Sequence, residues 1–130
     1  MRWLPLLMLA ACGGGGSEHV MTKAPNTELI VGKFERRPPD GTTVARFQAD
    51  GTITVAHDEA SLDRKNLAVG SYQLDGEKLT LTYASGDMCK PNETGNYKVV
   101  ISKIGIRFTK VDDPCADRAK IDGQTWYRAK

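Results

Sequence analysis

From residue 29 onward, short apolar runs alternate with turn-forming residues in the rhythm of an antiparallel β-meander. Leu79, Leu81 and Tyr83 alternate with two threonines, a period of two that predicts a strand with one buried face. Asp-Gly pairs at 50–51 and 75–76 each separate two such runs, which indicates hairpins because both residue types tolerate positive φ. The pattern predicts about eight strands, at residues 29–36, 43–48, 52–55, 68–74, 78–83, 97–101, 104–108 and 124–128.

The connections between these runs contain little helix. Residues 57–66 are polar and predict a loop with one helical turn at 60–64, while Asp113 before Pro114 predicts a short helical turn within 112–119. No helix is long enough to cover a sheet face, so the spacing fits a sandwich or a closed barrel, and closure removes edge strands. We therefore expect an all-β fold, an antiparallel up-and-down β-barrel of about eight strands with one short C-terminal helical turn.

The first residues of the chain have a different pattern. Arg2 precedes an apolar run at 3–11, which ends in two alanines and is followed by Cys12 and four glycines. An early charge, an apolar run and small residues are the layout of an export signal, and this run is too short to span a bilayer. A plain secretory signal, or a short buried helix that a cysteine happens to follow, would share this pattern.

The tetrad Leu9-Ala10-Ala11-Cys12 resembles a bacterial lipobox, which implies cleavage before Cys12 and attachment of acyl chains to it. We therefore expect a signal peptide at 1–11, a lipidated cysteine and flexible tether at 12–27, and a barrel domain at 28–130. This implies a protein of the cell envelope that is anchored to a membrane by lipid. Gly13 after the cysteine, rather than Asp, resembles lipoproteins sent to the outer membrane of cells with two membranes.

The composition bounds the domain and its partners. Eighteen basic and sixteen acidic residues give a net charge of +2 at pH 7, and they are scattered rather than clustered. This argues against a nucleic-acid partner. The residues beyond the tether suffice for one domain with one core.

The three cysteines divide into Cys12 and an even pair, Cys89 and Cys115. In an exported protein such a pair predicts a disulfide. A metal site would need ligands at CxxC or HxxxH spacing, and these are missing. A catalytic thiol would need a nearby histidine, yet His19 lies in the tether and His57 has no motif around it.

Several motifs resemble those of small bacterial lipocalin-like proteins, which are often exported as lipoproteins. Gly32-Lys33-Phe34 resembles the Gly-x-Trp signature of lipocalins with Phe for Trp, and residues 70–81 resemble the family's Gly-x-Tyr, Asp-Gly, Leu-Thr-Leu hairpin. Cys89 followed by a Gly-x-Tyr at 95–97 is also similar. The closing elements resemble Asp-Pro-Cys-x-x-Arg at 113–118 and Gly-Trp-x-Arg at 123–128. The likeness covers residues 29–130.

This resemblance implies an eight-stranded barrel with Cys89 bridged to Cys115 and an arginine packed over an aromatic ring near the closed end. An eight-stranded barrel either fills with side chains or holds one small ligand, and the many large inward residues fit both arrangements. If a pocket exists, we expect it to be mostly apolar, several hundred Å³ in volume, and open at the end away from Trp126 and Arg118. The residues expected to line it are Phe47, Tyr72, Leu81, Tyr83 and Phe108. The residues expected to be structural are Gly32, Phe34, Arg118, Trp126 and Arg128.

The sequence contains no nucleophile elbow, P-loop, dinucleotide fingerprint or HExxH motif. Asp58, Glu59 and Asp63 are calcium-type ligands without calcium-loop spacing, so we interpret them as a solvated loop. Arg118 and Arg128 are expected to stack on Trp126, with anion recognition as the alternative. We expect no enzyme, no cofactor and no metal. The expected function is non-covalent binding of a small apolar or amphipathic ligand. The alternatives are a module that binds another envelope or host protein, and a structural envelope component with a filled barrel.

Overall fold

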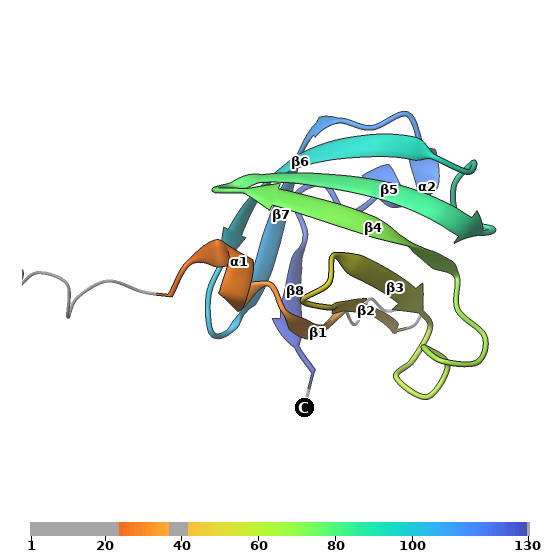
Figure 1. Ribbon diagram of the computed structural model, residues 1–130, viewed down its shortest axis with the longest axis horizontal. Helices are drawn as coiled ribbons and strands as arrows, with labels where there is room; N and C mark the ends of the chain where they lie inside the picture. Colours follow the sequence, from red (N-terminus) through yellow and green to blue (C-terminus); the bar gives the residue numbers. More distant parts are fainter. Residues whose placement is uncertain (1–23, 37–41, 130) are drawn as a thin grey trace, which may run out of the picture.

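The computed structural model describes residues 24–36 and 42–129. Eight antiparallel strands close into a barrel in sequence order, and two helices of four residues each accompany them (Figure 1), which confirms the expected fold. The strands are β1 Gly32–Arg36, β2 Thr43–Phe47, β3 Thr52–Ala56, β4 Ala68–Asp75, β5 Lys78–Gly86, β6 Glu93–Ile101, β7 Gly105–Asp112 and β8 Thr125–Arg128. The helices are α1 Asn26–Leu29 and α2 Ala116–Ala119.

Both Asp-Gly pairs form tight turns, as predicted. Gly51 has a φ of 91° between β2 and β3, and Gly76 has a φ of 61° between β4 and β5. Glycine adopts these left-handed angles without the clash that a Cβ would cause. The second turn sets the register that pairs Leu74 with Leu79. Because side chains alternate along a strand, this register directs one set of residues into the barrel.

The barrel closes where β1 pairs with β8, with Phe34 opposite Arg128 and Glu35 opposite Tyr127. Inside it, aromatic rings meet edge to face. Phe47 contacts Phe34 and Tyr72, with ring centres 5.9 and 5.1 Å apart. Phe108 contacts Tyr97 and Trp126, with ring centres 6.2 and 6.1 Å apart. Such pairs add a fraction of a kcal/mol to about 1.5 kcal/mol each beyond simple burial.

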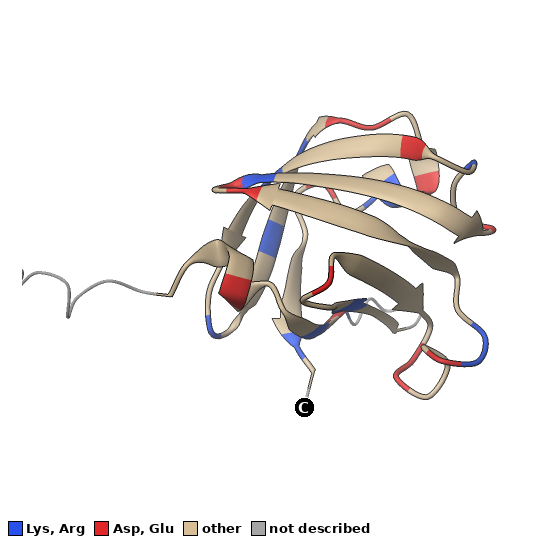
Figure 2. Cartoon of the chain, in the orientation of Figure 1, with Lys and Arg blue, Asp and Glu red and all other residues tan. Residues whose placement is uncertain are grey.

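The two ends of the barrel differ in how the strands are connected. At one end, here named the α1 end, short turns at 48–51, 76–77 and 102–104 lie beside α1. At the other, named the disulfide end, the connections at 57–67, 87–92 and 113–124 are longer, and the last of these contains α2 (Figure 1). Figure 2 shows acidic and basic residues interspersed along the chain.

The boundaries of some elements differ from those expected. The first strand begins at Gly32 rather than at the expected residue 29, because residues 26–29 form α1. Ile30, which follows α1, is fully buried in the core. Strand β6 begins at Glu93, four residues before the expected start at 97, because it pairs with β5 as far as Tyr83. Residues 60–64 form hydrogen-bonded turns, and the bond of 2.9 Å from the Lys65 amide to the Ser61 carbonyl has the spacing of the single helical turn expected there.

Candidate functional site

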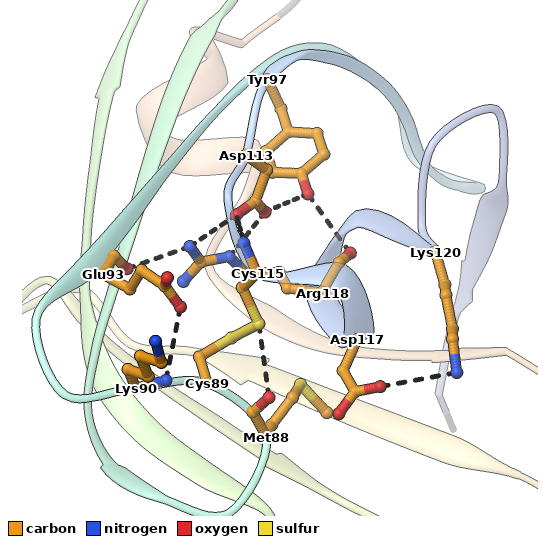
Figure 3. Close-up of a disulfide and its surroundings, with 10 residues drawn as sticks. All are labelled: Met88, Cys89, Lys90, Glu93, Tyr97, Asp113, Cys115, Asp117, Arg118 and Lys120. Carbon is orange, nitrogen blue, oxygen red and sulfur yellow. Dashed lines mark hydrogen bonds and ion pairs between the residues drawn. A yellow bond between two sulfur atoms is a disulfide. The ribbon is translucent and has the colours of Figure 1, made fainter.

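The disulfide end is fixed by a covalent bond between two of its connections. Cys89 and Cys115 form a disulfide, with their Cα atoms 5.5 Å apart, in agreement with the predicted pairing. The bond joins the 87–92 connection to the residue that precedes α2. It therefore holds α2 against the rim of the barrel (Figure 3).

Arg118 carries a buried positive charge at the disulfide end. It lies on α2, its residue is 1% exposed, and its guanidinium pairs with Asp113, whose side chain is also fully buried. Nε donates to Asp113 Oδ2 over 2.7 Å, and Nη2 donates to Asp113 Oδ1 over 2.8 Å and to the Glu93 carbonyl over 2.9 Å (Figure 3). This bidentate pair anchors α2 over the first residues of β6.

Two tyrosines complete the surroundings of Arg118. The Tyr97 hydroxyl donates to Asp113 and also lies 3.2 Å from the Arg118 carbonyl oxygen (Figure 3). The Arg118 guanidinium stacks on the Tyr83 ring, 4.7 Å from its centre. Burial raises the pKa of both hydroxyls, and the hydrogen bond to Asp113 raises the pKa of Tyr97 further. Both tyrosines are therefore neutral at physiological pH.

The charge of Asp113 follows from its hydrogen bonds. Burial by itself raises the pKa of this carboxyl, but hydrogen bonds from Arg118, Tyr97 and the Cys115 amide outweigh that effect. The pKa of Asp113 therefore lies below its ordinary value, and the group is a carboxylate at neutral pH. The Arg118–Asp113 pair is an ion pair that adds no net charge to the interior.

Gly95 on β6 makes room for this ion pair. A Cβ placed at Gly95 would lie 2.5 Å from Asp113 Oδ2 and 2.9 Å from Arg118 Nε. Both atoms belong to the buried bidentate contact, so neither can move aside without breaking it. Glycine is thus the residue that the close approach of the ion pair to the β6 backbone requires.

An inner cavity of about 80 Å³ lies at the disulfide end of the barrel interior. Its polar lining residues are Arg36, Thr43, Asp117, Arg118 and Lys120. Its remaining lining residues, mostly apolar, are Ala45, Phe47, Ile53, Val55, Leu81, Tyr83, Met88, Phe108, Ile121 and Trp126. Asp117 and Lys120 are exposed and form part of its rim. The cavity therefore combines a mostly apolar wall with charged groups, two of which lie at its rim.

The predicted position and size of the pocket were wrong. Arg118 and Trp126 line the cavity instead of plugging the opposite end, because α2 folds over the barrel rim beside the mouth. The volume of about 80 Å³ is far below the several hundred Å³ expected, because large side chains fill most of the interior. Of the residues expected to line a pocket, the wall contains Phe47, Leu81, Tyr83 and Phe108.

Tyr72 is not among these lining residues. Its hydroxyl donates to the Gln48 carbonyl over 2.6 Å, and burial raises the pKa of that hydroxyl. Its ring packs against Phe47 near the α1 end. Tyr72 therefore closes the turn between β2 and β3.

The expected stacking of Arg118 and Arg128 on Trp126 was also wrong in its partners. Arg128 stacks on Phe34, 4.7 Å from the ring centre, at the α1 end, whereas Arg118 stacks on Tyr83. The residue over the Trp126 ring is Arg36, 5.8 Å from its centre, and the sequence analysis did not select it. Strand β1 brings Arg36 to this position only because the barrel closes, so no local motif indicates it.

Two outer grooves adjoin the inner cavity. One, of about 400 Å³, follows the disulfide and is lined by residues that include Asp87, Lys90, Glu93 and Asp117. The other, of about 290 Å³, is lined by residues that include Arg36, Met88 and Lys120. Within the described residues, Cys89, Cys115 and Glu93 bring potential metal ligands within 4.8 Å of one another, but the two sulfur atoms are bonded to each other.

The acidic loop at 57–67 is built from local contacts. Asp58 accepts a hydrogen bond from the Ser61 amide over 2.8 Å, Glu59 pairs with Lys33, and Asp63 pairs with Arg46 at 2.9 Å. The three carboxylates therefore have separate partners. Below them, Leu62 packs with Val44 and Ala56 in a small buried cluster.

Cys12, Gly13 and the predicted signal peptide lie outside the described residues. Neither of the two helices described here has the length and apolar character needed to cross a membrane. Comparisons of the chain with protein-family models, with curated proteins and with solved structures gave no match.

Proposed function

We propose that this chain is a bacterial lipoprotein of the cell envelope whose lipocalin-like barrel binds a small amphipathic molecule without catalysis. The observation that carries the proposal is the inner cavity, where an apolar wall meets Arg36, Arg118, Asp117 and Lys120 at one end of the barrel. This arrangement suits a molecule with an apolar group inside and a polar group at the rim.

The size of the cavity limits the ligand. Ligand pockets usually measure about 300–1,000 Å³, whereas this cavity measures about 80 Å³. It has room for an apolar group of a few heavy atoms, since a water molecule takes about 30 Å³ in the liquid. The proposal therefore applies to short molecules, or to longer ones that insert only one end.

Binding is tested by native mass spectrometry of the protein purified from its own host, followed by titration with short amphipathic molecules. A retained small ligand, or saturable shifts of the amide signals of Leu81 and Phe108, supports the proposal. Absence of both, with the disulfide intact and the barrel folded, contradicts it. Lys65 lies on the exposed 57–67 loop, so Lys65→Ala is a control that should leave binding unchanged.

The anchor is tested separately with Cys12→Ser. Acyl chains on Cys12 place the wild-type protein in the detergent phase, because two or more chains hold a protein stably on a membrane. The variant should move to the aqueous phase or retain its signal peptide. Equal membrane retention of a correctly cleaved variant would contradict the anchor.

A second candidate is a protein-binding module, favoured by the groove of about 400 Å³ along the disulfide. Its walls come from two connections that the disulfide holds together, which gives a rigid outer surface. Lys90 lines this groove but not the inner cavity, so Lys90→Glu should weaken binding of a protein partner and leave the binding of small molecules unchanged. If Lys90→Glu instead weakens small-molecule binding and leaves protein binding unchanged, the small ligand is favoured.

A further inference from the structure

One hydrogen-bond donor at the disulfide end has no acceptor. Arg118 offers three nitrogens, and Asp113 and Glu93 occupy Nε and Nη2. Nη1 is shielded from solvent and has no partner within residues 24–36 and 42–129. A buried donor without an acceptor costs free energy, so such an atom calls for an explanation.

The position of Arg118 explains why this nitrogen has no acceptor. Its side chain belongs to the wall of the inner cavity, and its face lies against the Tyr83 ring. The bidentate contact with Asp113 fixes the plane of the guanidinium, so Nη1 is held in place before any ligand arrives. A fixed donor in a mostly apolar wall recognises an oxygen acceptor.

The charges around the cavity determine whether a neutral or an anionic oxygen acceptor fits best. Arg118 is paired with Asp113, and Lys120 is paired with Asp117 at 3.5 Å. Arg36 lines the same cavity and has no ion pair recorded within the described part of the chain. Its Nε is also buried without an acceptor there. The cavity lining together with Asp113 therefore carries one positive charge in excess, and the carboxylate of Asp87 lies in the adjoining outer groove that Arg36 also lines. Inside the cavity this balance favours an anion.

We propose that the inner cavity binds a short-chain carboxylate, whose oxygens accept hydrogen bonds from Arg118 Nη1 and Arg36. The alkyl chain then lies against the apolar wall formed by Phe47, Ile53 and Leu81. A cavity of about 80 Å³ has room for an alkyl chain of about three carbon atoms beside the carboxylate. Butyrate, which has three alkyl carbons, is therefore the best match. This inference rests on the proposed function and names the ligand class of that same site.

The first experiment titrates the oxidised, folded protein with acetate, butyrate, octanoate and 1-butanol, and follows amide and arginine side-chain NMR signals. Butyrate should bind best, because acetate leaves the apolar wall empty and octanoate exceeds the cavity. Butanol should bind about tenfold or more weakly than butyrate, because it lacks charge-assisted hydrogen bonds. Butyrate should also shift the Nη signals of Arg118.

Three variants locate the site. Ala45 is buried in the cavity wall, so Ala45→Ile fills the space and should weaken butyrate binding about tenfold or more. Arg36→Gln removes the excess positive charge and should weaken it several-fold. Arg107 is exposed on β7 outside the cavity, so Arg107→Gln is the matched control and should leave binding unchanged. If Ala45→Ile does not fold, Arg36→Gln and the ligand series on wild type decide the question.

The outcomes separate the two proposals. If butanol binds as well as butyrate in this cavity, the carboxylate inference is overturned and the proposed function stands. If butyrate binds without shifting the Arg118 signals, or binds Arg36→Gln as tightly as wild type, the assigned contacts are wrong. If none of these molecules binds, the carboxylate inference is overturned, and the proposed function is then decided by the native mass spectrometry and the amphipathic titrations described above.

Discussion

Each end of the barrel contains an arginine stacked on an aromatic ring, and in both cases the distance to the ring centre is 4.7 Å. At the α1 end, Arg128 over Phe34 donates to three backbone carbonyls, those of Leu29, Ser102 and Lys103. At the disulfide end, Arg118 over Tyr83 pairs with the Asp113 carboxylate. The two arginines make the same stacking contact and differ in their acceptors.

The acceptors decide what each end can do. The carbonyls around Arg128 come from α1 and from the turn between β6 and β7, so this residue joins separate segments and seals the end. The carboxylate beside Arg118 accepts hydrogen bonds from Nε and Nη2, and the buried Nη1 has no partner among the described residues. The first arrangement closes the barrel, and the second supplies the donor that we propose for the carboxylate.

Removal of the carboxylate should have the largest effect on stability. Asp113→Asn leaves the buried Arg118 charge without its counter-ion, which typically costs about 3–5 kcal/mol of the free energy of unfolding. Asp63→Asn is the matched control, because it breaks the exposed Arg46–Asp63 pair and should cost at most about 1 kcal/mol. Urea denaturation measures both. Equal losses for the two variants would show that burial does not distinguish the pairs.

Loss of the disulfide should come next. Cys89→Ser with Cys115→Ala opens a loop of 26 positions, and the loop-entropy relation assigns such a bond about 3.5 kcal/mol. Far-UV circular dichroism should show unchanged strand content at low temperature, while the midpoint of thermal unfolding falls. Hydrogen exchange should increase in α2 but not in α1. An equal increase in exchange in α1 and α2 would show that the disulfide does not act mainly on α2.

Arg128→Met should weaken the α1 end by a smaller amount. The substitution keeps most of the apolar contact with Phe34 but removes the donors to three carbonyls, which should cost about 1–3 kcal/mol. Faster amide exchange at Ile30, with unchanged exchange at Tyr97, would locate the change to this end. The control is Arg107→Met, at an exposed arginine on β7. An unchanged exchange rate at Ile30 would show that Arg128 does not fix α1.

Alkaline pH should act through the disulfide end, and its effect per residue should be among the smallest. Burial raises the pKa of Tyr83 and of Tyr97, while tyrosines of the unfolded chain ionise near pH 10. The folded state keeps these protons above pH 10, so the free energy of unfolding falls as the pH rises beyond that value, by about 1.4 kcal/mol per tyrosine at pH 11.

Tyr83→Phe should make this decline in the free energy of unfolding shallower, by the contribution of one tyrosine. Chemical denaturation at pH 8, 10 and 11 measures it, and absorbance at 295 nm should show that Tyr83 ionises only on unfolding. Tyr127→Phe, which removes an exposed hydroxyl on β8, is the control and should leave the slope of the decline as in wild type. A decline equally steep in wild type and in Tyr83→Phe would contradict the burial of the Tyr83 hydroxyl.

The sequence predicted the barrel because its signals are local. The alternation of Leu79, Leu81 and Tyr83 and the two Asp-Gly pairs depend on neighbouring residues, and both were confirmed. The disulfide was predicted because the exported setting left one even pair of cysteines. Helix α1 was missed because it has four residues and no side-chain cap, so no start signal marks it.

The functional details depend on contacts between distant segments. Arg118 and Arg128 were expected to stack on Trp126, but they stack on Tyr83 and Phe34, which lie on β5 and β1. The position of the cavity depends on how α2 folds over the rim, which spacing alone does not determine. The unpartnered Nη1 of Arg118 follows from the direction of one guanidinium, which no sequence pattern shows.

The absent side chain at Gly95 makes four positions of the chain depend on one another. A sequence that retained Asp113 and Arg118 but carried alanine at position 95 would place a Cβ 2.5 Å from the Asp113 carboxylate. Relatives with this end of the barrel should therefore change Gly95, Tyr97, Asp113 and Arg118 together or keep all four. That joint pattern offers a criterion for recognising distant relatives whose remaining positions have diverged.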